Sequence, residues 1–531
     1  MISKGTKQLA FIRSMRGKLL LAFLALALTP LVVVSILAYA RARSALQDAA
    51  FAQLQAVLTI KEYQIEDYLA KKAADVGALL GVAHTLHDEA FDNLLAIHTI
   101  KQSQIVSYFA ERRADVSTLA SDKTVIEALT AFETAVHTGT IRGPVWKAVE
   151  QNVGPWLTQY KEAYGYYDLL LIAADGDIVY TVEGEPDLGE NLLTGSLKDS
   201  PAAKAFQSAR RPGRGLRAVT LQDFELYAPS GGIPAGFVAA PIQQDGRTIG
   251  VVALQLGLEH INAIMQDRTG MGQTGEVYLM GPDHRMRSDS SISPDHTVAA
   301  SFAGMVGMAG LGSASVPAIP HPLTQEGRED CLICHGTGIG GAPQVSDEHV
   351  GRTDQSCRQC HIETRATSSG MDTVTSRQAL AGESGASVTL GYRGQYVLSA
   401  YAPVKVEGLN WAIIAEMDVA EAFVPQAEGA EYDLFTQYAQ NYGYPDLFLI
   451  AADGYVFHSA ARRADYQTNM LVGPYKDSSL GQLVREVMST GEPGIADFAP
   501  YAPSGGEPVA FLAARPVVYQ GETELIVVVQ L

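Results

Sequence analysis

The feature that most constrains the fold is an internal repeat of about a hundred residues. The segment 164–176 reads YGYYDLLLIAADG and recurs at 442–454 as YGYPDLFLIAADG. Further matches follow in the same order in both copies: Asn191 and Asn469, KDS at 198–200 and 476–478, and YAPSGG at 227–232 and 501–506. In each copy an apolar run ends in Asp-Gly, which is typical of a strand entering a tight turn, and a helix and closing strands follow. We therefore expect 151–265 and 425–531 to be two copies of one α/β module.

A third unit with a similar pattern lies between these copies and is interrupted. Its first part, 266–290, reads as a strand, a turn at Asp283 and a second strand. Its second part, 373–424, reads as a helix and three strands. The stretch 291–372 separates the two parts at a position where a loop is expected. Loops accept insertions because their ends stay close while the core is untouched.

The interrupting stretch contains the pattern C-x-x-C-H twice, as CLICH and CRQCH. This pattern attaches c-type haem: two thiols form thioethers to one porphyrin, and the next histidine binds the iron. We therefore predict two covalent c-type haems, with His335 and His361 as iron ligands. The four attachment cysteines are the only cysteines in the chain: Cys331, Cys334, Cys357 and Cys360.

Two other interpretations of these cysteines remain open. Two C-x-x-C pairs can bind one zinc ion, and four cysteines can form two disulfides. Neither site has a use for a histidine directly after each pair, so the haem interpretation is favoured.

Each iron accepts a sixth ligand, and His321 and His349 are the candidates. They precede Cys331 by ten residues and Cys357 by eight. The spacing does not assign either histidine to a particular haem. Other candidate ligands upstream are His296, Met305 and Met308, for which surface exposure and packing are the simpler roles. The sequence pattern of residues 320–361 resembles that of dihaem modules in multihaem cytochromes whose iron is bound by two histidines.

The first forty residues predict a membrane anchor. Residues 1–18 carry five basic side chains and no acidic one, and 19–40 is a 22-residue stretch without charge, long enough to span a bilayer as a helix. The basic flank predicts a cytoplasmic tail at 1–18, a bacterial inner-membrane span at 19–40, and a periplasmic or other extracytoplasmic location for the rest. A cleaved signal peptide is the alternative, since Ala38-Tyr39-Ala40 has the form of a cleavage site.

The stretch 41–150 has the apolar spacing of helices and few breaks, which predicts a helical stalk. Within it, 51–70 is repeated at 91–110, forty residues further on. A long apolar helix of this kind can pair with a second copy of itself, so we expect a homodimer through the stalk. The net charge of −19 argues against a nucleic-acid partner, because phosphate binding needs a basic surface.

Two segments of the interrupted unit carry a family resemblance. The lines GMGQTGEVYLMGPD…MRSDS at 270–290 and YRGQYVLSAYAPV…GLNWAIIAEMD at 392–418 resemble the double Cache sensor region of methyl-accepting chemotaxis proteins and related sensor kinases and cyclases. The resemblance covers roughly 45–425 apart from the insert. It implies a stalk helix, PAS-like modules, dimerisation and signalling across a membrane. The expected fold class is α+β, with transmembrane and stalk helices, Cache modules of mixed α/β structure with antiparallel sheets, and a small haem-binding insert at 291–372.

The chain departs from this family in three respects. The family lacks haem at this place. Its second membrane helix and HAMP domain are expected after Asp418, whereas here a third Cache-like module follows, which favours a fragment of a longer receptor over an output supplied by a partner. The amino-acid-binding motif of the family is not visible, so no ligand contacts are carried over. Asp168, Tyr180 and Tyr227 are candidates to line a pocket, with turn and packing roles as the alternative.

No catalytic constellation is visible, so we do not expect an enzyme. We predict a membrane-anchored sensor whose two haems sense redox state or a small gas. The partners expected are the inner membrane, a second copy of the chain and a cytoplasmic signalling or electron-transfer partner. A periplasmic dihaem electron-transfer cytochrome on a Cache scaffold is the first alternative. A small-molecule receptor with structural haems is the second.

Overall fold

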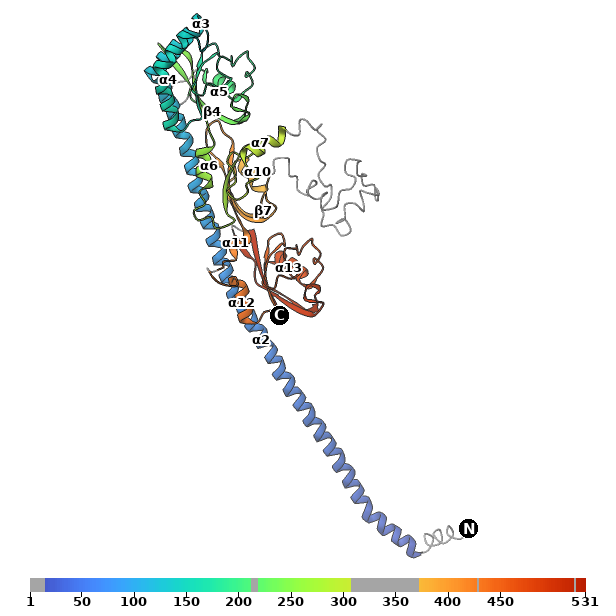
Figure 1. Ribbon diagram of the computed structural model, residues 1–531. Helices are drawn as coiled ribbons and strands as arrows, with labels where there is room; N and C mark the ends of the chain where they lie inside the picture. The colour runs from blue at the N-terminus through green and yellow to red at the C-terminus, as the bar shows by residue number, and fades with distance from the viewer. Residues whose placement is uncertain (1–14, 212–217, 307–371, 427–428, 520–521) are drawn as a thin grey trace, which may run out of the picture. The chain divides into compact units, whose positions relative to one another are not determined.

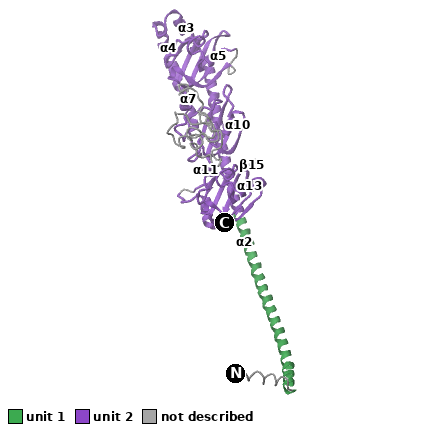
Figure 2. Ribbon diagram, turned by 90° about the vertical axis from the view of Figure 1, so that its right-hand side faces the viewer, with its two compact units in different colours: residues 1–75 green, residues 76–531 purple. Residues whose placement is uncertain are grey.

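The computed structural model describes residues 15–211, 218–306, 372–426, 429–519 and 522–531. Two compact units are distinguished, residues 1–75 and 76–531, and Figure 2 colours them separately. The first described helix, α2 (Met15–Ser121), contains the predicted span 19–40 without a break at Pro30. Among the described residues, α2 is the one helix that is long and apolar enough to cross a membrane.

The predicted stalk range 41–150 is helical but is not one helix. α2 ends at Ser121, and α3 (Lys123–Thr138) and α4 (Pro144–Tyr164) follow. The break is stabilised by Asp122, whose side chain accepts a hydrogen bond from the Thr124 N–H at 2.7 Å and so caps α3. From Val76 onward α2 belongs to the second unit, and one side of it is buried there.

Residues 168–256 form a five-stranded antiparallel sheet in the order β2-β1-β5-β4-β3, which we call module 1. Its elements are β1 (Asp168–Ala173), β2 (Ile178–Thr181), α5 (Pro201–Ala209), β3 (Thr220–Tyr227), η2 (Ala228–Ser230), β4 (Ile233–Gln244) and β5 (Arg247–Leu256). All six residues of β1 are buried, because alternate side chains face helices on opposite sides of the sheet. Helices α3 and α4 lie on one side and α5 on the other (Figure 1).

Residues 446–530 form a second sheet with the equivalent order, β11-β10-β15-β13-β12, which we call module 3. Its elements are α12 (Leu434–Tyr442), β10 (Asp446–Ala451), β11 (Val456–Ser459), α13 (Ser479–Thr490), β12 (Gly494–Pro500), η5 (Ala502–Ser504), β13 (Pro508–Ala513), β14 (Val517–Tyr519) and β15 (Glu522–Gln530). The register is also equivalent: Asp168 lies opposite Gln255 in module 1, and Asp446 lies opposite Gln530 in module 3.

The interrupted unit forms a four-stranded sheet in the order β6-β9-β8-β7, which we call module 2. Before residue 307 it contributes α6 (Glu259–Gln266), β6 (Glu276–Met280) and α7 (Val298–Val306). After residue 371 it contributes α10 (Val374–Leu380), β7 (Gly385–Leu390), β8 (Tyr396–Val404), β9 (Trp411–Asp418) and α11 (Val419–Phe423). Every strand pairing in the three sheets is antiparallel, so the prediction of an α+β fold with antiparallel sheets is confirmed.

The second copy of the helical repeat packs on module 2. Phe91 and Phe109 are buried, and the Phe109 ring meets Trp411 of β9 edge-on at 5.3 Å between centroids. His98 Nε2 donates a hydrogen bond to the carbonyl oxygen of Ile413 at 3.2 Å. This part of α2 is therefore integrated into the α/β core instead of forming a free stalk.

Candidate functional site

The predicted haem residues lie outside the described residues. They are Cys331, Cys334, His335, Cys357, Cys360, His361, His321 and His349, all within 307–371. The alternative ligand Met308 lies there too. His296 is described: its Nδ1 lies 2.7 Å from the Ser293 hydroxyl, and its ring packs edge-on against Tyr392 at 4.8 Å. The haem assignments remain predictions.

The helices on the two sides of 307–371 pack on the described modules: α7 contacts β4 of module 1 and two arginines of module 2, and α10 packs on β8 and β9 of module 2. At the entry, the Val298 N–H donates to Asp289 Oδ1 at 2.7 Å, and Phe302 of α7 is buried. At the exit, Thr373 is the N-cap of α10 and forms a capping box with Ser376: Thr373 Oγ1 accepts from the Ser376 N–H at 3.1 Å, and Ser376 Oγ accepts from the Thr373 N–H at 2.9 Å. The described residues on both sides of 307–371 are therefore held by hydrogen bonds and packing.

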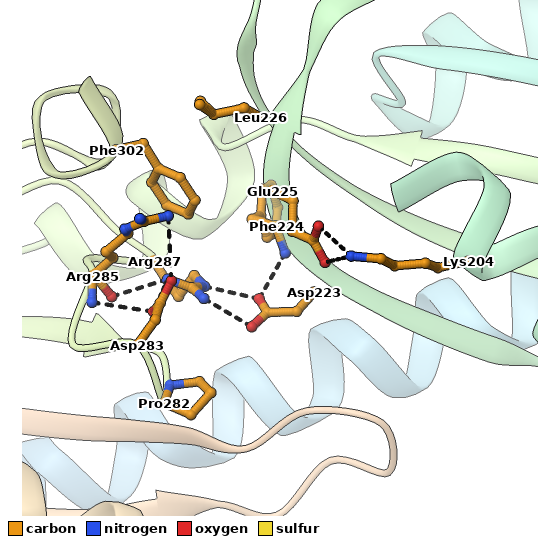
Figure 3. A pocket seen from close by; sticks show the side chains of 10 residues that line it. All are labelled: Lys204, Asp223, Phe224, Glu225, Leu226, Pro282, Asp283, Arg285, Arg287 and Phe302. Atoms are coloured by element: carbon orange, nitrogen blue, oxygen red, sulfur yellow. Dashed lines mark hydrogen bonds and ion pairs between the residues drawn. The ribbon is translucent and has the colours of Figure 1, made fainter. Parts of the chain in front are cut away.

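A cleft of about 560 Å³ lies where α7 meets module 1 (Figure 3). Module 1 contributes Lys204 from α5 and part of β3, and module 2 contributes the turn after β6 and Phe302 of α7. The residues lining it are Lys204, Asp223, Phe224, Glu225, Leu226, Pro282, Asp283, Arg285, Arg287 and Phe302. The cleft therefore joins two modules and the helix that leads into the predicted haem segment.

Arg287 and Asp223 form the principal polar contact between modules 1 and 2. The guanidinium donates from Nε to Asp223 Oδ1 at 2.8 Å and from Nη2 to Oδ2 at 2.9 Å. Trp411 Nε1 donates to the same Oδ1 at 2.9 Å, and Asp283 adds a second carboxylate 3.0 Å from the guanidinium. The side chain of Arg287 is 2 % exposed. A bidentate pair between a buried guanidinium and a partly buried carboxylate fixes the geometry of both partners.

Phe302 links α7 to this pair. Two guanidinium groups lie over its ring, that of Arg285 at 4.7 Å and that of Arg287 at 5.2 Å from the ring centroid. Cations over an aromatic face are attracted to its negative π-surface. A displacement of α7 would therefore act directly on the side chain that bridges the modules.

Two buried glutamates lie opposite each other in the sheet of module 2, Glu276 on β6 and Glu416 on β9. Tyr278 donates to Glu416 Oε1 at 2.9 Å, while Glu276 accepts from Ser290 at 2.6 Å and also from Tyr392. Burial raises the pKa of Glu416 to about 8, so this carboxyl is largely protonated at neutral pH. Ser290 precedes α7, so the pair is hydrogen-bonded to the segment that leads into the predicted insert.

Glu276 and Glu416 lie in the sequence motifs described above, but the sequence did not predict that they contact each other's strands inside the core. The sequence pattern that could have identified the two glutamates is a charged residue in a strand that is otherwise apolar. Glu276 begins EVYLM, and Glu416 lies within WAIIAEMD. Among the pocket candidates, Asp168 and Tyr227 lie together around Asp187, to which Tyr227 donates at 2.8 Å. Tyr180 instead stacks on Phe132 at 4.5 Å on the other side of the sheet.

Comparisons with known proteins give one curated relative and several structural likenesses. No protein-family model matches this sequence. Over 148 residues the chain is 28% identical to the probable chemoreceptor y4sI of Sinorhizobium fredii, a match that covers 27% of this chain and 18% of that protein. The chain thus matches less than a fifth of the length of this relative.

Two solved structures illustrate the structural likeness. The ligand-binding domain of the Pseudomonas fluorescens chemoreceptor CtaA with L-leucine is 14% identical, with a TM-score of 0.34, and the match covers 64% of this chain and 99% of that one. The sensor domain of the histidine kinase DctB of V. cholerae is 13% identical, with a TM-score of 0.36, covering 61% and 95%. Both TM-scores are below 0.5, so these likenesses carry no conclusion about this chain.

Proposed function

We propose that this chain is a membrane-anchored extracytoplasmic sensor of the chemoreceptor type, in which two covalent c-type haems sense redox state or a small gas. The observation that carries the proposal is the place of the C-x-x-C-H motifs: they lie in a segment that interrupts module 2 and is flanked by α7 and α10. The relationship to a probable chemoreceptor supports the signalling part. A role in signalling instead of catalysis is part of the same proposal.

The haem chemistry rests on the donor set of the segment. Each haem would be held by one cysteine pair, Cys331 with Cys334 or Cys357 with Cys360, and by the adjacent histidine, His335 or His361. His321 and His349 would complete the iron coordination. When bound, such groups accept and release electrons, and a sixth position vacated by histidine binds small gases. The chain supplies thiols and imidazoles in the numbers that two haems require.

A conformational signal from this segment would pass through the contacts that Phe302 of α7 makes with Arg285 and Arg287. A change in the segment would tilt α7, move Phe302 against Arg287, and alter the contact of Arg287 with Asp223 of module 1. Shifting a two-state equilibrium requires only a few kcal/mol of differential stabilisation. Because α2 carries Phe109 against Trp411, and Trp411 donates to Asp223, the same rearrangement would reach the helix that leads toward the membrane.

The membrane and assembly proposals rest on the N-terminal half of α2. Its apolar stretch supports an inner-membrane anchor with the modules outside the cytoplasm. Beyond that stretch, α2 exposes large apolar side chains, namely Leu46, Phe51, Leu54, Leu58, Ile60, Tyr63 and Ile65. Such a stripe supports pairing with a second copy of the helix. A cytoplasmic signalling partner would receive the output.

Hydrogen exchange tests whether the haem segment acts on the modules. In the haem-loaded full chain, reduction or exposure to NO is expected to change amide exchange in α7 and β3. A variant with all four cysteines replaced by serine should show no such change. Unchanged exchange in a protein whose haem spectrum does respond would contradict the sensor proposal.

That same outcome would favour the second candidate, an electron-transfer cytochrome. Two observations support this alternative: the motifs are separated by 26 residues, and two upstream histidines are present that would fill the sixth positions. Rapid reduction by a quinol-linked donor, without any response of the modules, would identify electron transfer as the function.

A further inference from the structure

Three carboxylates converge at one end of the module 1 sheet. Asp168 begins β1, and Glu185 and Asp187 lie in the loop after β2; each offers a carboxylate oxygen, and these atoms lie within 4.8 Å of one another. Asp168 and Asp187 are completely buried. Gln255, near the end of β5 and opposite Asp168 in the register, is 1% exposed.

In three of these side chains one polar atom is anchored and one oxygen is left over. Backbone N–H groups donate to Asp168 Oδ1 at 2.6, 2.9 and 3.1 Å, Tyr227 donates to Asp187 Oδ2 at 2.8 Å, and Gln255 Nε2 donates to Ser230 at 3.0 Å. Within the described part of the chain, no donor reaches Asp168 Oδ2, Asp187 Oδ1 or Gln255 Oε1, although all three are buried. Buried acceptors without a partner are rare and costly.

The electrostatics of the cluster are unfavourable without a positive charge. Burial raises the pKa of Asp168 to about 7, and the charge of Asp187 adds to this shift. Burial also raises the pKa of Asp187. Glu185 accepts from two neutral hydroxyl groups, Tyr167 at 2.9 Å and Ser230 at 2.6 Å. Among the described residues, no ion pair between a cationic side chain and Asp168, Glu185 or Asp187 is formed.

Module 3 contains the corresponding cluster with a reversal of charge at one position. Asp446, Asp465, Tyr501, Ser504 and Gln530 occupy the places of Asp168, Asp187, Tyr227, Ser230 and Gln255, but Arg463 stands where module 1 has Glu185.

Arg463 supplies in module 3 what module 1 lacks. Its Nη1 donates to Gln530 Oε1 at 3.0 Å, which is the atom left without a donor in Gln255, and to the Ser504 hydroxyl at 2.8 Å. Asp446 Oδ2 also has a donor, the Ser459 hydroxyl at 3.1 Å. Burial raises the pKa of Asp465, and the guanidinium of Arg463 opposes that rise. A guanidinium therefore lies beside the carboxylates of module 3, and it supplies the donor that the glutamine oxygen lacks in module 1. Asp465 Oδ1, the counterpart of Asp187 Oδ1, is without a donor among the described residues in the same way.

We propose that module 1 binds a hard divalent cation, best matched by Ca²⁺, through Asp168, Glu185, Asp187 and Gln255. Carboxylate and amide oxygens are the ligands that Ca²⁺ prefers, and it tolerates irregular arrangements of six to eight of them. Mg²⁺ demands a near-ideal octahedron and keeps several waters, which suits a buried site less well. The absence of sulfur and imidazole from the set disfavours zinc and copper. The ion would join the start of β1, the end of β5 and the loop that follows β2.

Calorimetric titration of the chelator-treated, haem-loaded full chain in detergent tests the proposal. We expect one Ca²⁺ per chain, binding at least tenfold more tightly than Mg²⁺. Glu185→Arg, which copies module 3, should weaken Ca²⁺ binding at least 100-fold. It should also remove the rise in melting temperature that Ca²⁺ gives the unchanged protein, while the calcium-free melting temperature stays the same or increases.

Asp177→Asn is the matched control. Asp177 belongs to a second group with His137 and Asp175; those two residues are exposed, whereas Asp177 is half-buried and accepts from Asn191. This variant should leave the Ca²⁺ affinity unchanged. Loss of binding in Asp177→Asn but not in Glu185→Arg, or no Ca²⁺ binding by the folded chain at millimolar concentration, would overturn the proposal.

Discussion

Replacing Arg287 by alanine is expected to lower the free energy of unfolding of residues 76–531 by about 3 kcal/mol. The guanidinium is almost fully buried and makes two hydrogen bonds to Asp223, so its removal leaves a cavity and a partly buried carboxylate without its cation. The loss is measured by denaturant unfolding of the full chain in detergent. The double variant Arg287→Ala with Asp223→Ala should recover part of it, because the uncompensated charge is then gone as well.

The same cleft provides a control. Lys204 and Glu225 form an ion pair there at 2.7 Å, but both side chains are more than a third exposed. Lys204→Ala should therefore cost less than about 1 kcal/mol. Equal effects of the two substitutions would show that Arg287 does not hold modules 1 and 2 together.

Replacing Phe91 by alanine is expected to cost about 3–5 kcal/mol, the range found when a buried aromatic ring is deleted. Phe91 is 0% exposed and stacks with Phe423 of α11 at 6.2 Å, so the substitution leaves a cavity between α2 and the region joining modules 2 and 3. Its counterpart forty residues earlier, Phe51, is 69% exposed.

Phe51→Ala is therefore the matched control. It should change the unfolding free energy of the isolated chain by less than about 0.5 kcal/mol. If the proposed pairing of α2 is correct, it should instead weaken self-association, which sedimentation of the detergent-solubilised protein measures. A loss of several kcal/mol in Phe51→Ala, with no change in Phe91→Ala, would reverse the assignment of the buried copy.

This pair of phenylalanines shows why part of the fold could not be predicted from the sequence. The copies 51–70 and 91–110 have the same helical spacing, and periodicity predicts an apolar side on each. What that side contacts depends on segments hundreds of residues away, such as Trp411 and Ile413 for the second copy. A local pattern predicts the helix and its apolar side but does not identify the surface that covers it.

Other parts of the fold could be predicted from the sequence because the patterns that indicate them are local or occur twice. The strand after Asp168 and the Asp-Gly turn at 175–176 were predicted because the same pattern occurs twice. The contact of Arg287 with Asp223 joins residues 64 positions apart in different modules, and no spacing rule predicts it. The exchange of Glu185 for Arg463 is visible in the aligned repeats, yet its meaning depends on which buried oxygens have a donor.

The two C-x-x-C-H motifs are proposed to hold covalent haem, and intact-protein mass spectrometry tests this most directly. After expression in a host that matures c-type cytochromes, the chain should carry the added mass of two haems. The variant Cys331→Ser with Cys334→Ser should carry one, as should Cys357→Ser with Cys360→Ser. A chain without added haem, or one that carries zinc bound by the four cysteines, would contradict the account.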